Sequence, residues 1–539
     1  MIVGILLPVA GTLVAYLCAH ALLIFYRNRA SPLRRILPSP PTQNIVLGNF
    51  KQIADDATLT SKWREEYGST YLFHGLFSVS ELFTTDLKAL NHIMAHPEIY
   101  QRPPTQRDTI RRLIGEGVLF AEAEQHKRHC HLQNPAFGTI QIRAVTQIFV
   151  EKALQLRDLW AKEQSGTIEV ISGLRKMTLD VIGRAGFGYD FAALDGTGNT
   201  ELDQAFTGLF HAPNSKLYGA LRVAQSMMPI LKLFPVPGQR LLNAARERMF
   251  VISRQIIEES KAHLLAEDEE LDKLNSLDRR RDLLSILLRA NMSADLPDHQ
   301  KLSDNEVVAQ IPGFFLAGHE TTSSAAAWAL HALSTNKAAQ TKLREEVLSV
   351  DTDHPTLDEL NALPYLEQVV RETLRAHSPV TAMQRKAMYD DALPLSKPIV
   401  DREGREHWSL PIPRGQMVQL PIWAVNTSKE VWGEDALEFK PERWSAVPAA
   451  ASEVPGVWAN LFTFLSGPHH CIGFRFALVE FKALLFTLVR AFEFDASVPK
   501  SGIAPFTAGA IQRPSVLLPG QSQRGQKSGL PLVVTPLNT

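Results

Sequence analysis

The sequence predicts a mainly α-helical protein with minor β-structure, preceded by a single N-terminal transmembrane helix. Three observations support this fold class. Apolar residues recur at helical spacing through most of the chain after residue 45, and only a few short segments have the character of strands. Residues 2–26 contain no Asp, Glu, Lys or Arg. Finally, no stretch has the composition of a linker, so we expect one large domain over residues 45–539.

The composition narrows the classes of function. The chain is 45% hydrophobic and 21% charged, as is usual for a globular protein. Its formal net charge of −1 gives no basic excess, so no nucleic-acid partner is expected. The three cysteines, Cys18, Cys130 and Cys471, are too few and too far apart for a disulfide framework or a zinc ribbon. This usage suits a reducing compartment, and each cysteine needs its own interpretation.

Residues 1–26 are predicted to form a transmembrane anchor, because about 20 apolar residues cross the hydrocarbon core of a bilayer. Arginines cluster in residues 27–35, and the positive-inside rule places that side in the cytosol. A cleaved signal peptide is the alternative, since AHA at residues 19–21 resembles a cleavage site, but the basic n-region is missing. Prolines make residues 27–44 a stiff, basic, extended hinge.

Periodicity places the elements of the body. Apolar residues at helical spacing predict helices at residues 141–163, 241–265, 281–290, 304–336 and 364–376. Short apolar segments predict strands at residues 70–73, 82–84, 417–420 and 529–534. The highly charged residues 266–282 are predicted to form a solvated loop.

Three glycines, Gly183, Gly186 and Gly188, loosely resemble a nucleotide-binding loop. Their spacing is not GxGxxG, and they follow a helical pattern instead of a strand. We interpret them as allowing close helix packing and a C-terminal turn. A flavin or nicotinamide domain is therefore not expected in this chain.

Cys471 lies in the segment FLSGPHHCIGFRFA, just before a predicted helix. A helix start favours a thiolate over a thiol. Gly467 and Gly473 let the backbone approach a flat group, and Phe464 adds a large aromatic side chain. Such a loop suits a single soft ligand to a planar metal cofactor, and haem iron with an axial thiolate is the candidate.

The loop alone leaves two further interpretations open. A lone cysteine is commonly a buried structural residue. Zinc bound by His469, His470 and Cys471 is the second interpretation, although three consecutive residues rarely converge on one tetrahedral ion.

Three further motifs carry chemistry. AGHETT, residues 317–322, puts glycine, an acid and two threonines inside a helix, which predicts either a kinked core helix or a local widening beside Glu320 and Thr321. There these two side chains could pass protons through water to a bound oxygen species. In ETLR, Glu372 and Arg375 share one helix face, and Arg443 of FKPERW could complete a buried structural network with them.

The four motifs stand in the order AGHETT, ExxR, PERW and FxxGxxxCxGxxxA, and the body as a whole resembles the cytochrome P450 family of haem-thiolate monooxygenases, in particular its microsomal, fungal-type members. The resemblance implies the cytochrome P450 fold for residues 45–539 and haem b (iron protoporphyrin IX) as cofactor. It implies Cys471 as the axial iron ligand, Phe464 as its shield and Gly473 beside the cofactor.

The resemblance also assigns the remaining motifs. It implies Thr321 and Glu320 as the oxygen-activation and proton-delivery pair. It implies a structural network of Glu372, Arg375 and Arg443. Electrons are expected from a separate NADPH–cytochrome P450 reductase, and cytochrome b5 is a candidate second partner.

The sequence departs from the family pattern at two positions. The family usually has arginine where His469 stands, and also where Cys130 stands, four residues after His126. Those arginines commonly pair with the haem propionates. The resemblance therefore implies Arg385, His126 and His469 as propionate contacts, and Cys130 as a small apolar replacement.

The family's substrate contacts correspond to mostly apolar positions, namely residues 102–120, 314, 315 and 317, 380–383 and 506–511. We expect a hydrophobic small-molecule substrate that arrives from the membrane, with a terpenoid of secondary metabolism first and an aromatic or xenobiotic compound as the alternative. The expected location is the endoplasmic reticulum membrane, single-pass, with the catalytic domain in the cytosol. The same motifs would also suit a non-oxygenase enzyme of this fold, a secreted peroxygenase, or a haem-binding protein without turnover.

Overall fold

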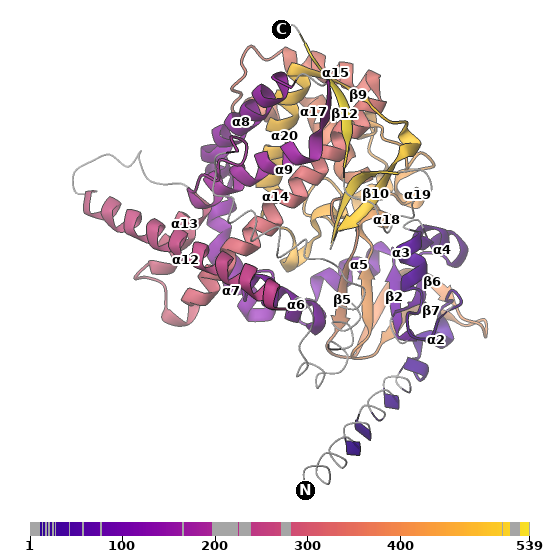
Figure 1. Cartoon of the computed structure of the whole chain (residues 1–539). Coiled ribbons are helices and arrows are strands. Elements are labelled where there is room, and N and C mark those ends of the chain that lie inside the picture. Colours follow the sequence, from indigo (N-terminus) through magenta and orange to yellow (C-terminus); the bar gives the residue numbers. More distant parts are fainter. Residues whose placement is uncertain are drawn as a thin grey trace. The chain divides into compact units, whose positions relative to one another are not determined.

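The structure is a computed structural model of residues 1–539 (Figure 1). It describes residues 28–196, 239–270, 282–517 and 529–537 except for 43, 57, 58, 76, 77, 164, 165 and 509, together with Gln225 and scattered residues between 11 and 26. The chain forms two compact units. Unit 1 comprises Met1–Thr105, Pro213–Arg240 and Ala382–Pro421, and unit 2 comprises Gln106–Ala212, Leu241–Thr381 and Ile422–Thr539. Because each unit combines separate stretches of chain, no single linker in the sequence divides them.

Unit 1 is built on a five-stranded sheet in the order β1-β2-β8-β5-β3, in which only the β2–β8 pair is parallel. The strands are β1 (Thr70–His74), β2 (Ser80–Thr84), β3 (Tyr100–Gln101), β5 (Met383–Ala387) and β8 (Met417–Leu420). A second, two-stranded sheet pairs β6 (Asp391–Val400) with β7 (Glu406–Ile412). The helices are α2 (Leu33–Ile36), α3 (Phe50–Asp55), α4 (Leu59–Tyr67) and α5 (Leu87–Ala95).

The predicted hinge needs a correction, because it is not extended throughout. Leu33–Ile36 form the helical turn α2, in which Leu33 and Ile36 are buried. The guanidinium of Arg34 donates to Ser80 Oγ at 2.8 Å and lies 3.2 Å from His74 Nδ1. Burial of two apolar side chains and these bonds to the β1–β2 hairpin outweigh the surrounding prolines, so the segment is part of unit 1.

Unit 2 is mainly helical. Its helices are α6 (Pro104–Ile114), α7 (Ala123–Gln133), α8 (Thr139–Ala161), α9 (Val170–Val181), α12 (Gln239–Glu270), α13 (Leu283–Met292), α14 (Asp304–Thr335), α15 (Lys337–Leu348), α16 (Leu357–Asn361), α17 (Pro364–Ala376), α18 (Ile422–Asn426), α19 (Lys429–Trp432) and α20 (Phe474–Ala491). Its strands form a sheet of β4 (Thr167–Glu169), β12 (Pro531–Pro536) and β9 (Phe492–Ala496), and a hairpin of β10 (Ile503–Ala508) and β11 (Ile511–Val516).

Short helical turns connect these elements. The 3-10 turns lie at Asn134–Phe137, Asp298–Gln300, Pro441–Ser445, Ala449–Glu453, Phe462–Phe464, Gly467–His469 and Lys500–Gly502. One π-helical turn spans Ile182–Gly186. A β-carbon at Gly183 would come within 2.4 Å of the Phe191 ring, and Gly188 has φ of 63°. The interpretation of these glycines as packing and turn residues is confirmed.

Helix α14 lies at the centre of unit 2 and packs against α9, α17, α20, β9 and β11 (Figure 1). A capping box starts it, since Ser303 and Glu306 exchange hydrogen bonds between side chain and backbone. The helix is α-helical throughout despite Pro312, and the local widening expected at AGHETT stays a prediction. Packing on several sides outweighs the low helix propensity of the motif.

Most of the predicted elements are confirmed. The helix expected at residues 364–376 and the strand at 417–420 coincide with α17 and β8. The other predicted helices correspond to α8, α12, α13 and α14, and the other predicted strands to β1, β2 and β12, with ends that differ by a few residues. In the predicted charged loop, α12 continues to Glu270, and residues 271–281 lie outside the described part.

The predicted anchor, residues 1–26, falls mostly outside the described residues, as does Cys18. Within the part of the chain that the structure describes, no helix has the length and hydropathy to cross a membrane.

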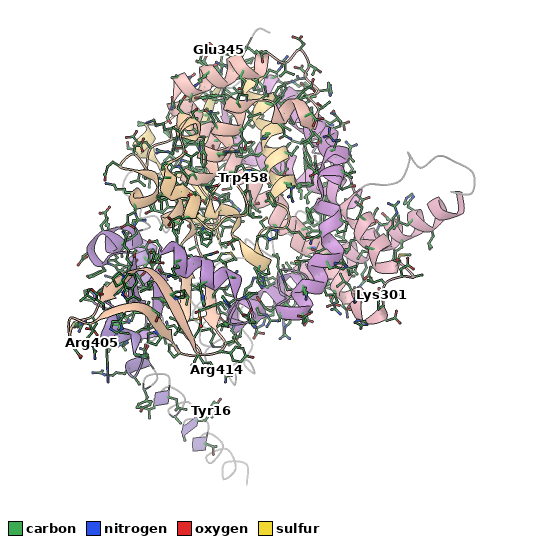
Figure 2. All side chains as sticks on the ribbon, turned by 180° about the vertical axis from the view of Figure 1, so that it is seen from behind. Tyr16, Lys301, Glu345, Arg405, Arg414 and Trp458 are labelled. Carbon is green, nitrogen blue, oxygen red and sulfur yellow. The ribbon has the colours of Figure 1, made fainter. Side chains whose placement is uncertain are left out.

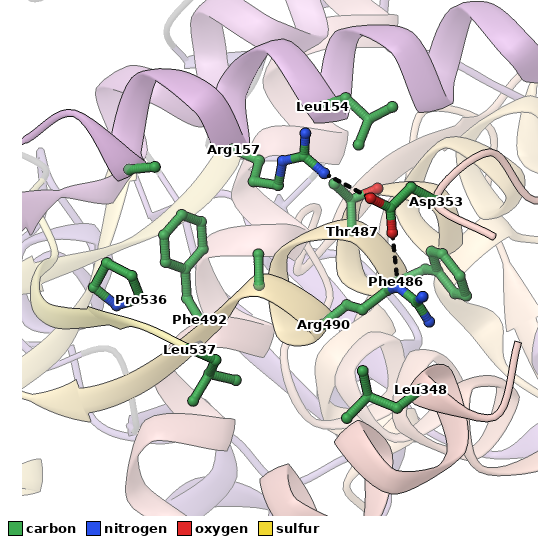
Figure 3. A pocket seen from close by; sticks show the side chains of 12 residues that line it. Leu154, Arg157, Leu348, Asp353, Phe486, Thr487, Arg490, Phe492, Pro536 and Leu537 are labelled. Atoms are coloured by element: carbon green, nitrogen blue, oxygen red, sulfur yellow. Dashed lines mark hydrogen bonds and ion pairs between the residues drawn. The ribbon is translucent and has the colours of Figure 1, made fainter. Parts of the chain in front are cut away.

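A surface pocket of about 230 Å³ lies where α8, α20 and β12 end (Figure 3). In Figure 3 the carboxylate of Asp353 lies between Arg157, at 3.1 Å, and Arg490, at 2.9 Å. The pocket shares no lining residue with the predicted functional site. Its charges are already paired, so it does not have the character of an ion-binding site.

Candidate haem site

The loop before α20 holds Cys471 in a tight fold. The backbone N–H of Cys471 donates to the carbonyl of Phe464 at 2.9 Å, so the two ends of the loop meet. Gly467 has φ of 64° and Leu465 has φ of 57°, both in the left-handed region. This conformation presents Cys471 three residues before α20 begins at Phe474.

Aromatic side chains surround this loop. The ring of Phe464 packs edge-on against Trp458, labelled in Figure 2, with centroids 5.8 Å apart, and lies 6.0 Å from the ring of Phe474. Gly473 caps α20, and a β-carbon there would make only ordinary contact with Phe137 at 3.5 Å. Packing within the protein therefore does not require glycine at 473.

The sulfur of Cys471 lies close to other protein atoms, although the residue itself is accessible. Cys471 is exposed by surface area, yet desolvation by the surrounding protein raises the pKa of its thiol to about 11, against the opposing effect of the Gly473 amide. The expectation that the helix start alone favours the thiolate is wrong, because burial outweighs it. A bound ferric ion would supply the positive charge that deprotonates the thiol.

Helix α14 has one accessible position in a largely buried stretch. Ala317 is exposed and Thr321 partly so, whereas His319, Glu320 and Thr322 are buried. The hydroxyl of Thr321 donates to the carbonyl of Ala317 at 2.6 Å. The Thr321 hydroxyl thus lies at the edge of the accessible face of the helix.

Glu320 lies on a different side of α14 from this face. Its carboxylate binds Arg175 of α9 at 2.9 Å and also Arg513 of β11, and His319 Nε2 lies 3.3 Å away. Burial raises the pKa of Glu320, but the hydrogen bond from His319 and the charges of both arginines outweigh it and hold that pKa well below its usual range. The structure therefore does not bring Glu320 and Thr321 together as a hydrogen-bonded pair.

Of the three residues predicted to contact the propionates, His126 and His469 lie together in unit 2. The imidazole rings of His126 and His469 stack with centroids 3.9 Å apart. Glu122, which the sequence reasoning missed, places its Oε2 3.1 Å from His469 Nε2. The Sγ of Cys130 lies 3.5 Å from His126 Nε2. Arg385 is in unit 1, on β5, where it is buried and donates to the carbonyl of Gln384 at 3.0 Å.

The structure brings Glu372, Arg375 and Arg443 together in the core of unit 2. Arg375 binds both oxygens of Glu372, each at 2.8 Å, and Arg443 Nε lies 3.5 Å from Glu372 Oε1. The indole of Trp444 donates to Glu372 at 3.1 Å. These contacts tie the PERW segment to α17.

Two of the predicted substrate contacts are core residues. Phe315 is 1% exposed, and its ring packs against Phe187 at 4.8 Å and Phe191 at 5.0 Å. Phe314, 7% exposed, packs against Phe137. Phe315 is therefore packed away from any ligand, and its assignment as a substrate contact is wrong.

The donor set at Cys471 fits haem iron. Among the described residues no group of three or more His, Cys, Asp and Glu could hold a metal ion, and His469 Nε2 is engaged by Glu122. This leaves one accessible soft sulfur, and a single protein thiolate suits haem iron, whereas a tetrahedral zinc ion needs several protein ligands. The imidazole nitrogens of His469 and His470 lie on the same loop as this sulfur.

Comparisons with known proteins agree with this site. The sequence model of the family Cytochrome P450 matches residues 38–516. Two proteins of Postia placenta, cytochrome P450 monooxygenases 205 and 128, are each 44% identical; the first covers 100% of this chain and 99% of the relative, the second 96% and 95%. Ganoderic acid synthetase of Ganoderma lucidum is 35% identical over 88% of this chain and 90% of its own length. The chain therefore belongs to the cytochrome P450 family of monooxygenases, whose cofactor is haem b bound through a cysteine thiolate.

Proposed function

We propose that this monooxygenase is anchored in the endoplasmic reticulum membrane and hydroxylates a hydrophobic small molecule with O2 and electrons derived from NADPH. The observation that carries the proposal is the accessible Cys471, held just before α20 on a loop closed by its hydrogen bond to Phe464. When bound there, haem supplies oxygen activation, which the electron donation of the thiolate favours.

The side chains around the thiol have separate tasks in this proposal. Cys471 holds the iron, and Phe464, fixed by Trp458, keeps water from the sulfur. Thr321, at the accessible face of α14, holds a proton at its hydroxyl beside the reacting oxygen. Glu320 is ionised and bound by two arginines, so proton delivery through it requires one of these ion pairs to open.

His126 and His469 are proposed as hydrogen-bond donors to the propionates, with Arg385 as a further contact. Glu122 supports this role, because its carboxylate, 3.1 Å from His469 Nε2, fixes the orientation of that imidazole. The two imidazoles thus stand in for arginines that the family usually has there.

The proposed substrate is an apolar small molecule, and a terpenoid of secondary metabolism is the class we favour. The apolar character of residues 380–383 and 506–511 supports it, and one relative is named ganoderic acid synthetase. These two segments include no arginine or lysine that would bind a substrate carboxylate.

The membrane location and the partners are part of the same proposal. Residues 2–26 lack charged side chains and arginines follow them, which supports a single-pass anchor with the catalytic domain in the cytosol. Because the sequence shows no dinucleotide fingerprint, a separate NADPH–cytochrome P450 reductase is the proposed electron donor, with cytochrome b5 as a second partner.

The test is the carbon-monoxide difference spectrum of the dithionite-reduced, full-length protein in microsomes. The wild type should show the strongly red-shifted Soret band of a thiolate complex, Cys471→Ser should lose it, and the matched control Cys130→Ser should keep it. A band at the position typical of histidine ligation in the wild type would contradict the assignment of Cys471. Extraction of the microsomes with alkaline carbonate tests the anchor separately: an integral protein stays in the pellet, and release would refute the anchor.

A further inference from the structure

Helix α20 carries a buried acid to which nothing above gives a role. Glu480 is 1% exposed, and neither of its carboxyl oxygens has a hydrogen-bond partner among the described residues. Burial raises its pKa well above the usual range, and the hydroxyl of Thr322 on α14 is near enough to oppose the rise in part. Two buried acids thus lie near the same turn of α14. Glu320, a residue of α14 itself, is bound by cations, whereas Glu480 of α20 is not.

The charged and titratable groups around α20 are engaged elsewhere. On α20 itself, Lys482 binds Glu367 at 2.7 Å, and the guanidinium of Arg475 lies over the ring of Phe474. On α14, Glu320 is bound by His319, Arg175 and Arg513, and His331 packs on Trp328. The other elements packed against α20 have pairs of their own: Lys152–Asp180 for α8, Arg344–Gln340 for α15, Asp358–Arg143 for α16, Glu372–Arg375 for α17 and Glu493–Lys337 for β9. Burial and Thr322 alone account for the state of Glu480.

These surroundings decide the protonation of the acid. An ionised carboxylate that is buried without a cation or donors costs several kcal/mol, so the group keeps its proton instead. A neutral carboxylic acid has one O–H donor. The oxygen of Thr322 can accept it, because the Thr322 hydroxyl already donates to the carbonyl of Gly318 at 3.1 Å.

The position of this contact links two parts of the proposed site. Helix α20 begins directly after the Cys471 loop, and Thr322 is the neighbour of Thr321 on α14. We infer that Glu480 is a positioning residue: protonated, it donates through one bridging water to the Thr322 hydroxyl, and so fixes α20 against the turn of α14 that carries Thr321. The inference rests on the proposed roles of Cys471 and Thr321.

If Glu480 is protonated in the folded protein, the stability of the protein depends on pH in a direction that can be predicted. A carboxyl group whose pKa is higher in the folded than in the unfolded protein costs no stability below its unfolded pKa, near 4.5, and costs increasing stability as the pH rises above it. Glutamine keeps the shape and an N–H donor without this cost. Glu480→Gln should therefore melt at a higher temperature than the wild type at pH 8, by at least about 2 °C, and the difference should vanish near pH 4.5.

The experiment compares full-length variants by circular dichroism and by the spectrum with carbon monoxide. Glu480→Gln should keep the wild-type fraction of red-shifted Soret band. Glu480→Leu and Thr322→Val should each lower that fraction at least twofold, and the double variant should be no worse than the single ones, because both remove the same contact. The matched control is Glu493→Gln, a partly exposed glutamate of the neighbouring strand that pairs with Lys337, which should not raise the melting temperature at pH 8.

Two results would overturn the inference. One is a Glu480→Gln melting temperature equal to or below that of the wild type at pH 8, which would mean that Glu480 is ionised and bound. The other is an equal spectral loss in the Gln and Leu variants, which would mean that the donor is irrelevant. A wild type without a red-shifted band would refute the proposed haem-thiolate function instead, and the melting curves would still test the protonation of Glu480.

Discussion

The replacement Arg375→Lys tests the buried network of Glu372, Arg375 and Arg443. Arg375 is fully buried and makes five hydrogen bonds: two to Glu372, both at 2.8 Å, and one each to the carbonyls of Asn426, Ala436 and Glu438, at 3.0, 2.6 and 2.9 Å. Lysine keeps the charge, so Glu372 stays paired. The substitution therefore isolates the contribution of the guanidinium fork.

The magnitude follows from the donors that are lost. An ammonium group has three donors at one point, so at least two of the five acceptors lose their partner. Each buried acceptor left without a donor costs about 1–3 kcal/mol. We therefore expect Arg375→Lys to lower the free energy of unfolding by about 2–6 kcal/mol, a large part of the stability of an ordinary domain.

The assay is equilibrium urea unfolding of the full-length protein in detergent, followed by circular dichroism. The midpoint should fall without a change in slope. The matched control is Arg143→Lys: Arg143 also binds an acid with two bonds, Asp358, but both side chains are more than half exposed, so we expect a much smaller loss. Equal losses in the two variants would refute the reasoning, because burial would then make no difference.

Three further predictions concern single contacts. His469→Arg should keep or improve haem retention, measured as the rate of haem transfer to apomyoglobin. Glu122 Oε2 lies 3.1 Å from His469 Nε2, so an arginine at 469 can still pair with this carboxylate, and it adds donors. Loss of haem binding would contradict the propionate assignment. Gly183→Ala should lower the melting temperature, because its β-carbon would lie 2.4 Å from the Phe191 ring, whereas Gly313→Ala on α14, with 3.9 Å to its nearest neighbour, should not; the reverse order in differential scanning calorimetry would count against this packing. The carboxylate of Glu320 contributes stability above its unfolded pKa that is lost as the pH falls toward its depressed folded pKa, so Glu320→Gln should destabilise at pH 7 and matter less at pH 3; a pH-independent effect in thermal melts would show that its ion pairs are not the cause.

Sequence alone predicted the features that depend on local spacing. The period of apolar residues located α8, α14 and α17, and the loop around Cys471 stood out because glycine, aromatic and helix signals coincide within fourteen letters of FLSGPHHCIGFRFA. The pair Glu372–Arg375 could be predicted for the same reason, since its members are three positions apart on one helix.

Contacts between distant segments could not be predicted in this way. Glu320 meets Arg175 and Arg513 through the packing of α9 and β11 on α14, and no periodic pattern marks those arginines. Glu122 reaches His469 likewise across most of the chain. Sequence reasoning identified the low helix propensity of AGHETT but not the packing on several sides that stabilises α14 there.

The interleaved construction of unit 1 has a consequence for synthesis on the ribosome. Strand β2 is made early, but its parallel partner β8 begins only at Met417. At 5–20 residues per second, the roughly 300 residues between them take about 15–60 s to appear. Throughout that time the β1–β2 hairpin presents an open edge that can pair with another nascent chain. A fragment that stops before Met417 should therefore aggregate, and the hairpin is the place where a chaperone would protect the unfinished protein.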